Sequence, residues 1–382
     1  MRQRKNMGRK ILCGAIFALL LACALTLGVC AEENKMPDEY KDFLASLPND
    51  AASSLPEGIY SEDVQEVADA VSRMSGVEYL FSLLIQGFGS GLSRVVPQLA
   101  LVVGLLTASA VGGLLSTHFS PSAAKIYGMC SRLALFCAIG GVAVSVLLSV
   151  KEFLSRLCAT VSAFLPLSAT LYTMGGNIGA ATKSGAGLMF TLGAVEFISG
   201  AVVVPLFCFC LCMSLVSCAS ADIGSVSLGG GVKKAFLSVL GIITMILSLS
   251  LSSQTLISAK ADSLAMKGAK MFLGGIPVTG GTVSSSLGTL ASSVELIRGT
   301  VGVGGIIILL MLLLPTLIEL WLMRCMYSLL GSFSGMLGMA GEQKLLTEVS
   351  ELYGILEGVA IMCSVVFFVA MGVLCTSAPA IA

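Results

Sequence analysis

The feature that most constrains this chain is a series of apolar runs of about twenty residues, the length that an α-helix needs to cross the hydrocarbon core of a bilayer. Hydrophobic residues make up 56% of the 382 residues and charged residues only 12%, which is unlike a soluble domain. The sequence therefore predicts an all-α, polytopic integral membrane protein with about six to eight transmembrane helices. The clear crossings are expected at residues 95–115, 133–150, 201–219, 235–257, 301–323 and 352–375.

The N-terminus has the layout of a secretory signal peptide over residues 1–31. Basic residues precede an apolar run, and the small-residue triplet Val29-Cys30-Ala31 follows it. This order predicts cleavage after Ala31, with an uncleaved signal anchor as the alternative. In both cases residue 32 onward starts on the outer side of the membrane. The loop after the first crossing is basic without acidic residues, which predicts that it is cytoplasmic.

Residues 32–76 form an acidic extracytoplasmic segment with two short amphipathic helical patterns. The first pattern joins Tyr40, Phe43, Leu44 and Leu47, and the second joins Val64, Val67, Ala68, Val71 and Met74 after Ser61, the expected N-cap. These helices are too few to bury a domain alone, so we expect them to pack on a partner or on the membrane domain. The apolar stripe over residues 77–94 predicts an interfacial amphipathic helix. Residues 95–382 form the multi-span membrane domain.

Two stretches of the membrane domain resemble each other and predict two related, parallel units, 133–219 and 235–323. Val195-Glu196-Phe197-Ile198-Ser199-Gly200 returns as Val294-Glu295-Leu296-Ile297-Arg298-Gly299. The same offset superimposes the glycine pairs Gly175-Gly176 and Gly274-Gly275. Each unit carries a glycine-rich insertion, at 151–200 and 258–300. We expect re-entrant pairs of half-helices that turn near the glycines and are sheltered by other helices, with full crossings as the alternative.

Ionisable residues in apolar sequence are the candidate conduit or coupling residues, because such a charge costs roughly 2.5 kcal/mol or more unless it is paired or hydrated. The carboxylates in this position are Glu196, Glu295, Glu319 and Glu357. Glu196 and Glu295 are preferred since they are equivalent in the proposed repeat. The alternative is a helix cap or an interhelix salt bridge, for instance to Lys183 or Arg298. The candidate set also includes Gly175, Gly176, Gly274, Gly275, Lys260, Asp262, Lys267 and Lys270. On a helix, the three lysines lie on one face. We expect this face to meet a pore, an acidic partner or lipid phosphates; the alternative is that the lysines only reach the lipid headgroups.

The sequence lacks the residue patterns of an enzyme. His118 is the single histidine, so no histidine-based catalytic set or HExxH zinc site exists, and no phosphate-binding loop is present. None of the 13 cysteines lies in the exterior segment 32–76, which argues against a disulfide framework there. Lysines and arginines are scattered singly, which excludes a nucleic-acid surface. We therefore expect no catalysis, no cofactor, no metal and no nucleic-acid partner.

The stretch Ile257-Ser258-Ala259-Lys260-Ala261-Asp262-Ser263-Leu264, with Lys270-Met271-Phe272 and Ile276-Pro277-Val278 after it, resembles the stage III sporulation protein AE family. The order of signal peptide, acidic exterior segment and multi-span body is also similar. This resemblance implies a non-enzymatic core membrane subunit of a channel that joins mother cell and forespore and is required for late forespore gene expression. It further implies a place in the outer forespore (mother-cell) membrane, beside other stage III sporulation membrane proteins and a separate secretion-type ATPase.

Two other functions remain open from the residues themselves. The first is an autonomous secondary transporter in which Glu196 and Glu295 bind protons or cations at the repeat interface. The second is a membrane scaffold that anchors the ring proteins of the channel.

Overall fold

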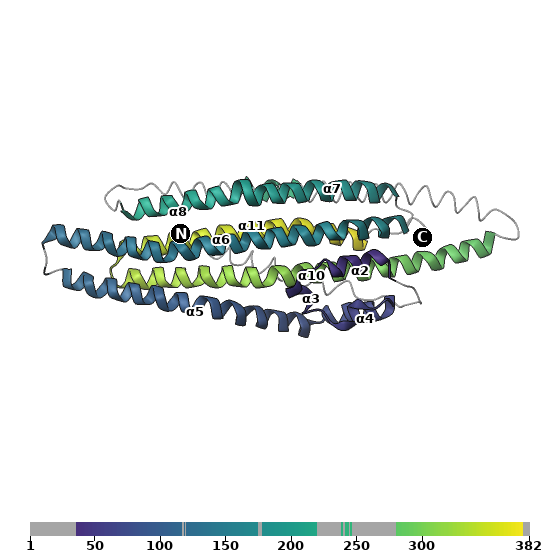
Figure 1. Cartoon of the computed structure of the whole chain (residues 1–382), viewed down its shortest axis with the longest axis horizontal. Coiled ribbons are helices and arrows are strands. Elements are labelled where there is room, and N and C mark those ends of the chain that lie inside the picture. The colour runs from purple at the N-terminus through teal and green to yellow at the C-terminus, as the bar shows by residue number, and fades with distance from the viewer. Residues whose placement is uncertain are drawn as a thin grey trace, which may run out of the picture.

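The computed structural model describes residues 36–116, 118, 120–174, 178–219, 238–239, 241–243, 245–246 and 280–376. The described residues are 92% helical and include no strand, so the predicted all-α fold is confirmed. Five of the described helices are long and apolar enough to cross a membrane. They lie side by side along one axis and form an elongated bundle (Figure 1).

The elements fall into a group of short helices followed by the long helices of the bundle. The short ones are α2 (Asp38–Ala45), α3 (Asn49–Ala52), the 3-10 helix η1 (Glu57–Tyr60) and α4 (Val64–Met74). The long ones are α5 (Val77–Ser116), α6 (Pro121–Met174), α7 (Ile178–Phe197), the π-helical turn η2 (Ile198–Val203), α8 (Val204–Ala219), α10 (Gly280–Met336) and α11 (Ala340–Thr376).

The longest helices exceed the thickness of a bilayer. α6 has 54 residues and α10 has 57, so each is about 80 Å long at a rise of about 1.5 Å per residue. The hydrocarbon core is only about 30 Å thick, so more than half of each helix lies outside it. The helix of 133–150 continues through charged residues because Glu152 and Arg156 pair on its surface, four residues apart, at 2.7 Å.

The α5–α6 pair and the α10–α11 pair turn at the same end of the bundle, which we call the hairpin end (Figure 1). α5 passes into α6 after Ser116, and the Ser109 hydroxyl there donates to Glu342 of α11 at 3.2 Å. α10 passes into α11 through Gly338, whose φ of +74° lies in the left-handed region that favours glycine. Ser334 closes this turn by donating its hydroxyl to the Met339 carbonyl at 3.1 Å.

The short N-terminal helices pack on the opposite end of the bundle. The Phe43 ring of α2 meets the Phe164 ring of α6 edge-on, with centroids 5.5 Å apart. Val71 of α4 lies against Gly304 of α10, where an added Cβ would be 3.4 Å from a Val71 methyl. Both predicted helices exist and bury their apolar faces, and the expectation that they pack on the membrane domain is confirmed.

The expected N-cap of α4 is wrong by two residues. Asp63 caps the helix, because its Oδ1 accepts the Gln65 backbone N–H at 2.9 Å. Ser61 donates its hydroxyl to Glu66 at 2.6 Å and accepts the Asp63 backbone N–H at 3.1 Å. Serine and aspartate are both good N-caps, so the sequence alone did not distinguish them.

The segment 77–94, expected as a separate interfacial helix, is the first half of α5 and runs without a break into 95–116. Two glycines in the segment 77–94 allow α5 to approach α10 closely. A Cβ at Gly87 would lie 2.6 Å from Ile318 Cδ1, and a Cβ at Gly91 would lie 2.9 Å from Leu322 Cδ1. These close approaches make α5 part of the bundle over its whole length.

Gly91→Leu is expected to weaken the contact between α5 and α10 and to lower the free energy of unfolding by about 1–3 kcal/mol, because the added side chain overpacks the site. Gly89→Leu is the matched control, since a Cβ at Gly89 meets nothing within 4 Å. Thermal unfolding of the purified protein in detergent measures both variants. Equal destabilisation by the two substitutions would contradict this close packing.

Candidate functional site: a polar layer inside the apolar bundle

An ion pair between a half-exposed arginine and a buried glutamate joins α10 and α11 near the middle of the bundle. Arg324 Nη1 lies 2.8 Å from Glu357 Oε2. The Glu357 side chain is 4% exposed and that of Arg324 is 47% exposed. Gly354 makes room for the guanidinium, because a Cβ there would lie 3.1 Å from Arg324 Cζ. The Ser350 hydroxyl of α11 donates to the Arg324 carbonyl of α10 at 3.0 Å, so a second polar contact joins the two helices beside the ion pair.

Two tyrosines stack beside this ion pair. The rings of Tyr327 and Tyr353 are 5.3 Å apart and inclined by only 21°. Both side chains are buried between α10 and α11. The ion pair, Ser350 and the tyrosines together form what we call the polar layer.

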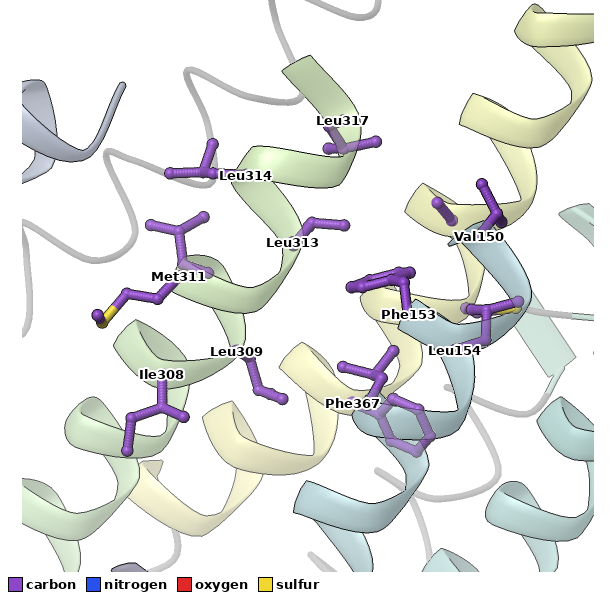
Figure 2. Packing of buried hydrophobic residues seen from close by; sticks show 14 of the residues in the cluster. Val150, Phe153, Leu154, Ile308, Leu309, Met311, Leu313, Leu314, Leu317 and Phe367 are labelled. Carbon is purple, nitrogen blue, oxygen red and sulfur yellow. The ribbon is translucent and has the colours of Figure 1, made fainter. Parts of the chain in front are cut away.

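Outside the polar layer, further charged and aromatic side chains lie on the surface of the bundle. Arg94 of α5 pairs with Glu319 of α10 at 2.7 Å, with Arg94 65% exposed. The Trp321 ring meets Phe88 edge-on at 6.1 Å. On α6, Lys151, Glu152 and Arg156 lie around Phe153, which points toward Leu309 and Leu313 of α10 (Figure 2). We call these exposed charged and aromatic residues the belt; such residues mark membrane interfaces.

Between the belt and the hairpin end, the bundle exposes apolar side chains. α6 has no ionisable residue between Arg132 and Lys151, a length of about 27 Å, which matches a hydrocarbon core of about 30 Å. The exposed residues here include Val96, Leu99, Leu101, Val111, Leu133, Val144 and Leu148. By contrast, α2 and α4 and the turn before α4 expose Asp38, Asp42, Glu62 and Asp69. The stretch between Arg132 and Lys151 is thus one level of the bundle that fits a bilayer. Exposed apolar side chains also lie beyond the belt, among them Phe81 and Ile85 of α5 and Phe190 of α7.

The expected crossings do not all lie at this level. The first turns of 301–323 lie beyond the belt, because Gly304 contacts Val71 of α4 and Gly305 contacts Met371 of α11. The last turns of 352–375 therefore lie there too. These segments are apolar because other helices surround them: α10 is buried on nearly every side from Val301 to Leu314. A helix that is apolar all round can be a protein core as well as a membrane span.

Arg298 is a second buried ionisable residue, close to the N-terminal helices. It is 1% exposed, and its guanidinium carbon lies 4.9 Å from the centre of the Tyr172 ring of α6. The planar guanidinium suits such stacking on an aromatic face. Sequence reasoning named Arg298 only as a partner for Glu295 and missed its burial. The available signal was its position between Leu296, Ile297 and Val301, all of which are buried as well.

The structure does not bring the two preferred carboxylates together. Glu196 is exposed at the end of α7 and acts electrostatically on Cys158 of α6. Glu295 is exposed three residues before Arg298, which lies over Tyr172. Cys158 and Tyr172 are separated by about 20 Å along α6. Glu196 and Glu295 thus lie at different levels of the bundle.

The other predicted site residues fall outside the described residues: Gly175, Gly176, Gly274, Gly275, Lys260, Asp262, Lys267 and Lys270. α6 ends at Met174 and α7 begins at Ile178, and the two helices pack side by side. The described parts of the first predicted insertion belong to longer helices, because 151–174 is part of α6 and 178–203 leads into α8.

The polar layer was only half visible in the sequence. Glu357 stood out as a carboxylate in apolar sequence, but its partner Arg324 is 33 residues away. The same holds outside the layer for Glu319, whose partner Arg94 is 225 residues away. In the described part of the chain, no three His, Cys, Asp or Glu side chains gather as metal ligands would.

A family model described as stage III sporulation protein AE matches residues 64–378, which cover α4 to the end of α11. No curated protein matches the chain, and no solved structure matches it.

Proposed function

The chain belongs to the stage III sporulation protein AE family, and on this premise we propose that it is a non-enzymatic core membrane subunit of the channel that joins mother cell and forespore. The protein is a sporulation membrane protein by family and by its apolar helices. In this proposal it lies in the outer forespore membrane, assembles with other stage III sporulation membrane proteins, and relies on a separate secretion-type ATPase.

The polar layer is the observation that carries this proposal. Glu357 is ionisable and buried inside an apolar bundle, and Arg324 reaches it from the next helix. Buried ion pairs add little to stability compared with apolar residues of the same size. Ionisable residues placed within membrane helices more often serve a pathway or a switch. The layer therefore supports a role in transport, and it replaces Glu196 and Glu295 as the proposed conduit site.

The length of the bundle also supports a subunit that connects compartments. The helices extend beyond the bilayer on the side where α2 and α4 pack. If residue 32 onward starts outside, this end projects into the space between the two forespore membranes. The hairpin end then faces the mother-cell cytosol, in agreement with its basic residues Lys125 and Arg132.

Glu357→Gln tests the proposal in a sporulating host. Glutamine keeps the shape of the side chain but removes its charge, so a conduit role predicts that late forespore gene expression and heat-resistant spore yield fall to the level of a deletion strain. The variant should still accumulate in the membrane in normal amount. Glu152→Gln is the control, since Glu152 is 63% exposed in a surface pair. Normal spore formation with Glu357→Gln would contradict a conduit role for the layer.

An autonomous secondary transporter is the second candidate, because a buried carboxylate beside an arginine can also bind a proton. Purified protein in liposomes separates the two. Gradient-coupled uptake by this chain alone, lost in Glu357→Gln, would favour the transporter. A plain scaffold predicts that Glu357→Gln leaves both assembly and sporulation intact.

A further inference from the structure

The two tyrosine hydroxyls of the polar layer are buried without the hydrogen bonds that such groups need. Tyr327 and Tyr353 are both 0% exposed, and neither hydroxyl oxygen has a hydrogen-bond partner among the described residues. A buried polar group in a folded protein is almost always bonded to protein or to ordered water. A hydroxyl that lacks both destabilises the fold.

The two hydroxyls cannot satisfy each other. The rings are stacked with their centroids 5.3 Å apart, and the two side chains interact electrostatically. Even a direct bond between the hydroxyls would use the hydrogen of only one, because each hydroxyl carries a single hydrogen. The other hydroxyl would still hold a hydrogen that no acceptor in the described part of the chain takes up. A further acceptor is therefore needed between α10 and α11 at this level.

Polar side chains near the tyrosines on the two helices have other partners. Arg324, three residues before Tyr327, donates from Nη1 to Glu357 at 2.8 Å. Ser350, three residues before Tyr353, donates its hydroxyl to the Arg324 carbonyl at 3.0 Å. Rotating these side chains onto the tyrosines would break the polar contacts that join α10 to α11.

Gln98 of α5 is an independent sign of an additional polar group at this level. α5 and α10 both run toward the hairpin end (Figure 1), and Gly91 of α5 lies against Leu322 of α10. Gln98 follows Gly91 by seven residues on the same helical face, and Tyr327 follows Leu322 by five. Gln98 and Tyr327 therefore lie at about the same height in the bundle. The Gln98 Oε1 atom is buried and also lacks a hydrogen-bond partner among the described residues.

We propose that water molecules are bound inside the bundle at this level and complete the hydrogen bonds of Tyr327 and Tyr353. A water molecule accepts the hydroxyl hydrogen that has no acceptor in the chain, and its own two hydrogens are available to buried oxygens such as Gln98 Oε1. Further along α11, Phe367 packs with Phe153 of α6 among apolar side chains that offer water no partner (Figure 2). The contact between α10 and α11 is thus hydrated at the tyrosines and dry around Phe367. This site goes beyond the proposed channel function and does not depend on it.

Radiolytic footprinting of the full-length protein in detergent tests the site, because water bound in the interior forms hydroxyl radicals beside the residues that it touches. Mass spectrometry should show that Tyr327 and Tyr353 are oxidised several-fold faster than Phe367, which is also 0% exposed but lies among apolar side chains. Tyr60, 47% exposed, gives the rate of an aromatic ring in bulk water. Oxidation of both buried tyrosines as slow as that of Phe367 would overturn the water site.

Phenylalanine substitutions give a second test that separates bound water from a dry pair of hydroxyls. Tyr327→Phe and Tyr353→Phe each remove one partner of the water and should each lower the unfolding temperature by about 2 °C. The double variant should unfold at a lower temperature than either single variant, because the space of the water then has no polar lining. A dry pair predicts the reverse, since the double variant leaves no hydroxyl stranded. Recovery of the unmutated protein's unfolding temperature in the double variant would therefore overturn the proposal.

Discussion

Arg324→Gln should destabilise the protein by about 1–3 kcal/mol, the cost of leaving a buried hydrogen-bonding group without its partner. The stranded group is Glu357, whose side chain is only 4% exposed. Glu357→Gln should cost only about 1 kcal/mol, since the amide oxygen still accepts from Arg324, and Arg324 is 47% exposed and reaches solvent. The asymmetry between the two single variants is the expected result.

Thermal unfolding in detergent, with the double variant Arg324→Gln/Glu357→Gln included, measures this asymmetry. The double variant should be more stable than Arg324→Gln alone, because it removes the stranded charge. Arg156→Gln is the control for an exposed pair and should change stability by less than about 1 kcal/mol. Equal losses of stability in Arg324→Gln and Glu357→Gln would contradict this asymmetry and show that water reaches Glu357.

Arg298→Ala should cost about 3 kcal/mol, because it removes a large, fully buried side chain and leaves a cavity. Its contact with the Tyr172 ring is lost at the same time. Arg298→Lys keeps the charge but loses the planar stack, and we expect a loss of about 1 kcal/mol. Tyr172→Phe keeps the aromatic face and should be nearly neutral.

A double-mutant cycle with Arg298→Ala and Tyr172→Leu measures the stack itself, with unfolding in detergent as the readout. Glu295→Ala is the control on the same helix, three residues earlier and exposed, and should stay within about 0.5 kcal/mol. If Glu295→Ala lowered the stability as much as Arg298→Ala, the predicted carboxylate Glu295 would also contribute to the stability of the fold.

The sequence predicted well what depends on local pattern. The amphipathic spacing of Tyr40, Phe43 and Leu44 gave α2 its buried face, and the spacing of Val64, Val67 and Val71 did the same for α4. These features follow from helical periodicity, which acts over a few residues.

What the sequence missed depends on contacts between distant residues. The apolar run 301–323 is typical of a span, yet its first turns are surrounded by protein, and hydropathy does not separate these environments. Glu319 finds its partner Arg94 on a helix 225 residues earlier. No local pattern encodes such a pairing, so the Arg94–Glu319 ion pair could be found only from the tertiary structure.

The unbroken course of α6 and α10 has a mechanical consequence. An α-helix of this length resists bending, so a tilt applied at the end where α2 packs is carried to the hairpin end about 80 Å away. Pro315 lacks a backbone amide hydrogen and removes one hydrogen bond of α10, six residues before Trp321. This break makes the level of Pro315 a place where α10 bends more easily than elsewhere.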